Sequence, residues 1–196
     1  MDLFLIGSMD IYELMLWFFI YSFCGWCMEC VVIRHQKGYW ENRGFAKLPF
    51  CIIYGFGVYI ALHLFAPIQD NYLALYICGC IGATALEYIT AQIMLKLFGE
   101  VWWDYSHLKF QYKGILCLES TLAWGLLALF IFGFFNRYVE LAVLLMNHAF
   151  VMVAGAGLTL AYLGDFSYHF IKKIYEHREA RQAEGSIGHG ADESYE

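Results

Sequence analysis

The uninterrupted apolar stretch LMLWFFIYSFCGWCM, residues 14–28, decides the fold class of this chain. It contains no charged side chain, and residues 122–135 form a second uncharged run. A helix crosses a bilayer with about 20 mostly apolar residues. Of the 196 residues, 61% are hydrophobic and 15% are charged, whereas soluble domains are roughly 45–50% apolar and about 25% charged. The sequence therefore predicts an all-α fold: a polytopic helical membrane protein with a multi-pass arrangement in the cell membrane.

The pattern of apolar runs predicts about five transmembrane helices, each near the length that a span requires. Residues 1–10 contain no Lys or Arg, so the first apolar run is expected to stay as a span and not to act as a cleaved signal peptide. A tight turn is expected at residues 136–138, between the fourth and fifth spans. The predicted spans are residues 11–33, 50–68, 72–97, 114–135 and 139–163.

The basic residues are distributed very unevenly along this pattern. Of the twelve Lys and Arg, all except Arg137 fall on the first connection, at or within the third connection, or after the fifth span. Because cytoplasmic connections carry the excess of Lys and Arg, the N-terminus is predicted outside and the C-terminus in the cytoplasm. Residues 1–170 are predicted to form the transmembrane helical bundle, and the polar residues 171–196 to form a disordered cytoplasmic tail.

Three acidic residues lie inside predicted spans and are the main functional candidates: Glu29, Glu87 and Glu119. An acid at a helix centre costs on the order of 2.5–3.5 kcal/mol to insert, so all three are expected to face the bundle interior. Tyr21 lies on the helix face of Glu29. The rise per residue places the acids in the cytoplasmic half, where they are expected to converge near Arg43. They would bind a cation, a proton or a polar/basic substrate, or form structural ion pairs with arginines.

The remaining candidates for substrate binding are Trp26, Trp103, Asp104, Asn147 and His148. Two of them belong to the segment WWDYS, residues 102–106, whose aromatic side chains suit the membrane–water interface; this segment either anchors the chain there or contacts a partner. Asn147 and His148 give the fifth predicted span a polar pair. The thiols of CGWCMEC, residues 24–30, lie within an apolar helix, which argues against a redox site. No His or Cys spacing predicts a metal site, and no cofactor is assigned.

Several functions lack the motif that they need. The chain has no GxxxxGK[ST] sequence, so any ATP-binding subunit that drives transport is a separate polypeptide. Basic residues are too few and too close to the membrane for nucleic-acid binding. Stripes of small residues on the spans are compatible with a homodimer within the lipid bilayer.

Blocks of residues along most of the chain resemble a known family. In order they are Tyr21-Ser22, Gly25-Trp26 with Glu29, Asn42-Arg43-Gly44-Phe45, Pro49-Phe50, Ile53-Tyr54-Gly55, Glu87-Tyr88 with Thr90, residues 102–106, and Gly114, Cys117, Ser120 and Trp124-Gly125. The chain resembles the CmpB-like ABC-transporter permeases, a family of small multi-pass membrane proteins. It departs from the family pattern at Val101 and Ile115, where that pattern has arginine. The resemblance implies a multi-pass fold and a role in transport.

Three functions remain open from the sequence. The first is a membrane transporter or permease component with an acidic intramembrane site that faces the cytoplasm. The second is a membrane-embedded enzyme acting on a lipid or a hydrophobic metabolite, with Glu29, Glu119, Tyr21 or His148 as proton donors. The third is a non-catalytic membrane subunit that docks a partner through residues 102–106.

Overall fold

The computed structural model describes residues 6–192, with side chains for residues 7–182, and is almost entirely helical. A short 3-10 turn, Ile6–Ser8, precedes the helices. Two-residue strands β1 (Gln111–Tyr112) and β2 (Leu116–Cys117) pair antiparallel in the third connection. The helices are α1 (Ile11–Lys37), α2 (Ile52–Phe65) with a 3-10 turn at Ala66–Ile68, α3 (Tyr72–Phe98), α4 (Leu118–Phe130), α5 (Asn136–Leu145) and α6 (His148–Asp192). The predicted all-α polytopic fold is confirmed.

Four helices of the described residues are long and apolar enough to cross a membrane. The shorter apolar helix, Ile52–Ile68, corresponds to the second predicted span. It rises about 25 Å, somewhat less than the hydrocarbon thickness of about 30 Å. The long helices are Ile11–Lys37, Tyr72–Phe98, Leu118–Leu145 and His148–Gln182. Five apolar helices therefore correspond to the five predicted spans, although the boundaries of the fourth and fifth spans shift the most.

The tight turn predicted at residues 136–138 is wrong. A π-helical turn, Ile131–Phe135, joins α4 to α5, so one continuous helix runs to Leu145 and the chain reverses at Met146, whose backbone is extended. The reason is the environment of Asn136, which is 1% exposed and accepts hydrogen bonds from two side chains of α1. A polar residue that is satisfied inside the bundle resembles a turn residue when only the sequence is read.

Local sequence accounts for the two ends of α1. Asp10 caps the N-terminus: its side chain accepts from the backbone N–H groups of Tyr12 and Glu13, and the Glu13 carboxylate accepts from the Asp10 N–H. This reciprocal arrangement is a capping box. At the other end Gly38 takes the left-handed conformation, with φ of 81°, and its N–H donates to the Arg34 carbonyl. Glycine adopts this conformation without the steric cost that a side chain brings.

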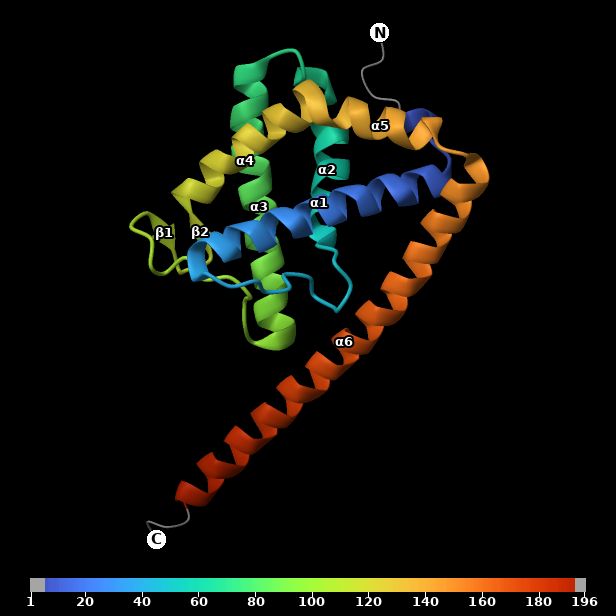
Figure 1. Cartoon of the computed structure of the whole chain (residues 1–196). Coiled ribbons are helices and arrows are strands. Elements are labelled where there is room, and N and C mark those ends of the chain that lie inside the picture. The colour runs from blue at the N-terminus through green and yellow to red at the C-terminus, as the bar shows by residue number, and fades with distance from the viewer. Residues whose placement is uncertain (1–5, 193–196) are drawn as a thin grey trace.

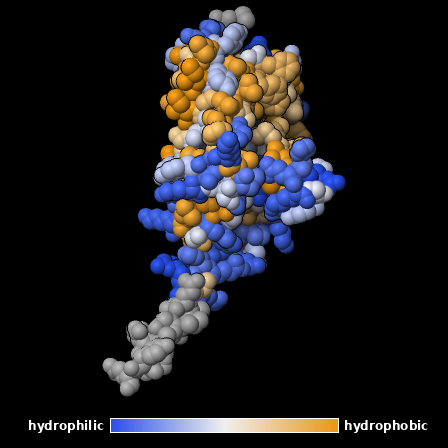
Figure 2. All heavy atoms as spheres, turned by 90° about the vertical axis from the view of Figure 1, so that its left-hand side faces the viewer, coloured by the Kyte–Doolittle hydropathy of each residue, from blue (hydrophilic) through white to orange (hydrophobic). Residues whose placement is uncertain are grey.

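The long connections collect at one end of the bundle, here called the polar end: residues 38–51, residues 99–117 and α6 from Asp165 onward. The Leu48 N–H donates to the Asp165 carboxylate at 2.8 Å, and Lys173 pairs with Glu100 at 2.6 Å. Figure 1 shows α6 extending past the other helices at this end. Figure 2 shows an apolar upper surface above a polar lower one. The cytoplasmic orientation of the polar end stays a prediction.

The opposite end, here called the short-turn end, holds the chain reversals near residues 69–71 and 146–147. The His148 Nε2 lies 2.8 Å from the Asp10 carboxylate, which joins the start of α6 to the start of α1. The largest fully buried side chains are Trp17, Leu62, Leu75, Glu140, Val143, Val151, Asn136 and Ser22. The best-packed part of the bundle thus includes two polar residues of α5.

The predicted division at residue 170 is not marked by a break in the backbone. α6 continues as a helix from His148 to Asp192, through the region expected to be a separate tail. The boundary between the bundle and a cytoplasmic tail stays a prediction.

Candidate functional site

Glu29 on α1 lies against two side chains from the next elements of the chain. The Tyr54 hydroxyl on α2 donates to Glu29 Oε1 at 2.6 Å. Arg43, from the first connection, places its Nε 3.8 Å from Glu29 Oε2, an ion-pair distance that is too long for a hydrogen bond. The Arg43 Nη2 instead donates to the backbone carbonyl of Trp102 at 3.0 Å. Glu29 is therefore held by a tyrosine and faces an arginine that also ties two connections together.

Glu87 on α3 is the more deeply buried of the two acids, with 7% of the residue exposed. The Tyr105 hydroxyl donates to Glu87 Oε1 at 3.0 Å, and the Trp124 indole N–H on α4 donates to Oε2 at 3.3 Å. Burial, followed by the nearby Glu87 carboxylate, raises the pKa of Tyr105, so its hydroxyl keeps the proton that it donates. Each oxygen of this buried carboxylate thus has one neutral donor.

Tyr54 and Trp124 bring the two acids into one site. Their ring centroids lie 5.9 Å apart, so the partner of Glu29 packs against the partner of Glu87. Gly25 makes room for Tyr54, because a Cβ at this position would lie 2.6 Å from the Tyr54 Cβ and closer still to its ring. This set is called the acidic cluster: Glu29, Arg43, Tyr54, Glu87, Tyr105 and Trp124.

Three members of the acidic cluster were not predicted from the sequence: Tyr54, Tyr105 and Trp124. All three stand in the blocks that carry the family resemblance. Buried tyrosine and tryptophan need a hydrogen-bond acceptor, and the intramembrane carboxylates are the natural acceptors. That pairing rule was the available indication, although it could not have identified which ring meets which acid.

The structure does not bring Glu119 into the acidic cluster. Its side chain is exposed in the first turn of α4, where a negative charge is favourable at the positive end of the helix dipole. The helix begins at Leu118, four residues later than the predicted span. Glu119 therefore lies in the first turn of α4 and not in the middle of a span.

The other polar-end candidates hold the connections in place. Trp26 donates from its indole N–H to Asn42 Oδ1 at 2.7 Å, and Trp103 donates to the Ile115 carbonyl at 2.8 Å. Asp104 accepts from the backbone N–H and the hydroxyl of Ser106, at 2.8 Å and 2.9 Å. These hydrogen bonds hold the pKa of the Asp104 carboxyl below its usual value. Asp104 stabilises a turn and makes no contact with Arg43 among those described.

The remaining candidates lie away from the acidic cluster. Asn147 caps α6 by accepting from the backbone N–H groups of Ala149 and Phe150, and His148 pairs with Asp10 on the surface. Asn147 and His148, the polar pair predicted within span five, thus lie at the start of α6, at the short-turn end. Tyr21 is buried and donates to Asn136 Oδ1 at 3.1 Å.

A second polar group occupies the buried half of α5. Asn136 Oδ1 accepts from Trp17 as well as from Tyr21, and Glu140, one turn further on, is 0% exposed. The sequence pattern predicted a turn at Asn136 and indicated no role for Glu140. The available indication was an acidic residue inside the predicted span 139–163.

An apolar cavity of about 180 Å³ lies between α1, α2 and the α4–π-helical segment. Both Tyr21 and Tyr54 line it, so it adjoins both polar groups. Its lining consists of Tyr21, Cys24, Gly25, Met28, Tyr54, Val58, Leu127, Phe130, Ile131 and Phe135. Among the residues that the structure describes, no group of three His, Cys, Asp or Glu side chains could hold a metal ion.

A family model described as "Putative ABC-transporter type IV" matches residues 16–170. The chain belongs to this CmpB family. The matched residues include every member of the acidic cluster. Membership in the CmpB family and the apolar helices together identify a multi-pass membrane protein related to ABC transporters, which fits the lipid bilayer and an ATP-binding partner. No curated protein and no solved structure matches the chain.

Proposed function

We propose that this CmpB-family chain is the membrane component of a transporter and that its acidic cluster binds a cation, either a proton or a basic substrate. The observation that carries the proposal is the convergence of Glu29 and Glu87 through the packed rings of Tyr54 and Trp124. Intramembrane acids are costly to insert and usually serve a function. The N-terminus is taken as outside and the polar end as cytoplasmic, on the distribution of Lys and Arg.

The charges and aromatic faces of the acidic cluster favour a positively charged ligand. The acidic cluster contains two carboxylates and one guanidinium, which lies beside Glu29, so it has one negative charge in excess when both acids are ionised. The other hydrogen-bond partners of the carboxylates are neutral hydroxyl and indole groups. Faces of tyrosine and tryptophan attract cations through their ring quadrupoles. A cation would supply the missing charge next to surfaces that already suit it.

The difference in exposure between Glu29 and Glu87 indicates the order in which a cation would reach them. Glu29 is partly exposed, with 31% of its side chain accessible, whereas Glu87 is buried, with 7% of the whole residue exposed. Arg43, whose side chain is 12% exposed, stands beside Glu29 and is fixed to the Trp102 carbonyl. We infer that a cation enters from the polar end past Glu29 and Arg43 and reaches Glu87 second. An ATP-binding subunit on another chain would supply the energy for uphill movement, because this chain has no nucleotide motif.

Replacement of either clustered acid is expected to reduce cation flux about tenfold or more, because a hydrogen bond to a charged group contributes about 1.5–3 kcal/mol. The full chain is reconstituted into proteoliposomes, with a pH-sensitive dye for protons and labelled methylammonium for a basic solute. Imposed gradients drive flux without an ATP-binding subunit. Glu29→Gln and Glu87→Gln are compared with wild type, and Glu119→Gln is the control, because it removes an exposed acid outside the cluster. Flux that survives both cluster substitutions would refute the proposal.

The apolar cavity supports a second candidate, an enzyme or carrier for a lipid or hydrophobic metabolite. Its volume of about 180 Å³ is similar to that of engineered cavities of about 150 Å³ that bind benzene. Mass spectrometry of purified protein is expected to detect a bound apolar molecule, and Leu127→Trp, which fills the cavity, is expected to reduce its amount severalfold. An equal amount in wild type and Leu127→Trp would exclude the cavity as the binding site.

A further inference from the structure

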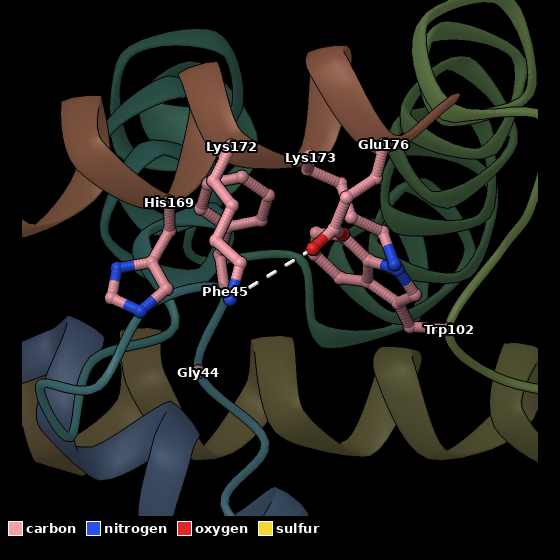
Figure 3. Close-up of a pocket in the computed structure, with 7 residues that line it drawn as sticks. All are labelled: Gly44, Phe45, Trp102, His169, Lys172, Lys173 and Glu176. Carbon is pink, nitrogen blue, oxygen red and sulfur yellow. Dashed lines mark ion pairs between the residues drawn. The ribbon is translucent and has the colours of Figure 1, made fainter. Parts of the chain in front are cut away.

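A separate pocket of about 230 Å³ lies at the polar end, between α6 and the two long connections. Figure 3 shows its side chains reaching from α6 toward Phe45 and Trp102. The two aromatic rings stack with centroids 4.9 Å apart and form one wall. The full lining is Gly44, Phe45, Trp102, His169, Lys172, Lys173 and Glu176. The pocket thus combines an aromatic wall with a cationic one.

The position of the pocket along α6 is compatible with a membrane surface. From His148 to Lys172 the helix rises about 36 Å, slightly more than the hydrocarbon core of about 30 Å. His148 itself lies at the short-turn end, beside Asp10. α6 is therefore long enough for Lys172 and Lys173 to lie at the level of the headgroup phosphates of one membrane surface when His148 lies at the other.

The cations of the pocket differ in how firmly they are held. Lys173 lies 2.6 Å from Glu100 and lowers the pKa of that carboxyl through their hydrogen bond. Lys172 and Glu176 are 3.8 Å apart, and their side chains are 58% and 54% exposed. Such an exposed ion pair contributes little to stability. Lys172 can therefore exchange Glu176 for another anion at low cost.

His169 adds a donor on the same face of α6. Its Nδ1 lies 2.8 Å from the Asp165 carbonyl and 3.2 Å from the Asp165 carboxylate, and its side chain is 23% exposed. Asp165 in turn accepts from the Leu48 N–H, so the ring is held against the first connection. With one ring nitrogen fixed, the other edge of His169 is available to a ligand in the pocket.

We propose that this pocket binds the phosphate of an anionic lipid headgroup. The phosphate replaces Glu176 as the partner of Lys172, and Lys173 and His169 contact its other oxygens. Phe45 and Trp102 pack beside the glycerol portion of the lipid. Basic pockets between helices at a membrane surface bind anionic headgroups in this way. The site is distinct from the acidic cluster, because it takes a ligand of the opposite charge.

The test measures the shift in unfolding midpoint of the purified full chain in neutral detergent as dihexanoyl-phosphatidylglycerol is added. Dihexanoyl-phosphatidylcholine, inorganic phosphate and sodium chloride of equal ionic strength are parallel additions. Only phosphatidylglycerol is expected to raise the midpoint. Lys172→Gln is expected to weaken its apparent affinity about fivefold, because a basic residue near a membrane surface contributes about 1 kcal/mol. Glu176→Gln is expected to strengthen the affinity severalfold, because it removes the competing carboxylate.

The control is Lys109→Gln, which removes an exposed lysine from the third connection outside the pocket and is expected to leave the affinity unchanged. Both Lys172 and Glu176 are exposed, so their variants are expected to fold as wild type does. An equal response to phosphatidylglycerol in wild type, Lys172→Gln and Glu176→Gln would overturn the proposal. An equal response to inorganic phosphate would overturn the assignment to lipid.

Discussion

Gly25→Ala is expected to lower the free energy of unfolding by about 1–3 kcal/mol, the usual cost of an extra methyl group in a packed interior. The new Cβ would meet Tyr54 at its Cβ and its ring, and a Cβ cannot swing away as the tip of a side chain can. Either α1 and α2 separate or the Tyr54 ring turns. Both changes disturb the hydrogen bond from Tyr54 to Glu29, so cation flux is expected to fall with stability.

The unfolding midpoint of the purified chain in detergent measures the effect. Gly157→Ala is the matched control, because Gly157 lies on an exposed face of α6 and a Cβ there meets nothing within 4 Å. Alanine favours a helix over glycine by about 0.5–1 kcal/mol, so Gly157→Ala is expected to match or exceed wild type in stability. If the two variants are equally stable, α1 and α2 do not pack as closely as described.

Asn136→Leu is expected to destabilise the chain by about 1–3 kcal/mol, the cost of leaving buried donors without an acceptor. Asn136 Oδ1 accepts from the Trp17 indole at 3.3 Å and from the Tyr21 hydroxyl at 3.1 Å. Leucine has the same branching at Cγ as asparagine and carries no acceptor. Because these donors are on α1 and the acceptor is on α5, the loss acts on the packing between helices.

A double-mutant cycle separates this hydrogen bonding from a change in packing. Tyr21→Phe removes one of the two donors, so Asn136→Leu is expected to cost less in the Tyr21→Phe background than in wild type. Unfolding midpoints of the two single variants and the double variant give the coupling energy. Strict additivity would show that the hydroxyl of Tyr21 contributes nothing through Asn136.

The sequence was sufficient for the fold class because apolar runs report directly on the solvent that a helix faces. It placed Ile11–Lys37 and Tyr72–Phe98 well, where caps and run lengths agree. It failed at residues 136–138, since an Asn–Arg pair resembles a turn unless its partners are known. Trp17 and Asn136 are 119 positions apart, and no local pattern links them.

The acidic cluster was also predictable only in part. The cost of burying a charge identified Glu29 and Glu87, and that argument depends only on residue type and span. Glu119 was expected in the interior of a span because the start of that span was predicted four residues before α4 begins, and the structure places Glu119 in the first turn of α4. The partners Tyr54, Tyr105 and Trp124 come from three other elements, so only the packed structure could match each to its acid.

The continuity of α6 has a mechanical consequence. The first residue of this helix, His148, contacts Asp10 at the short-turn end, and its described side chains continue to Gln182 at the polar end. That length is about 50 Å, so a tilt of about 5° about His148 would displace the far end by about 4 Å. Lys173 and Asp165 link this rod to Glu100 and Leu48, in the two connections that carry Arg43 and its carbonyl partner. A small tilt of α6 would therefore displace these two connections, and with them Arg43 beside Glu29.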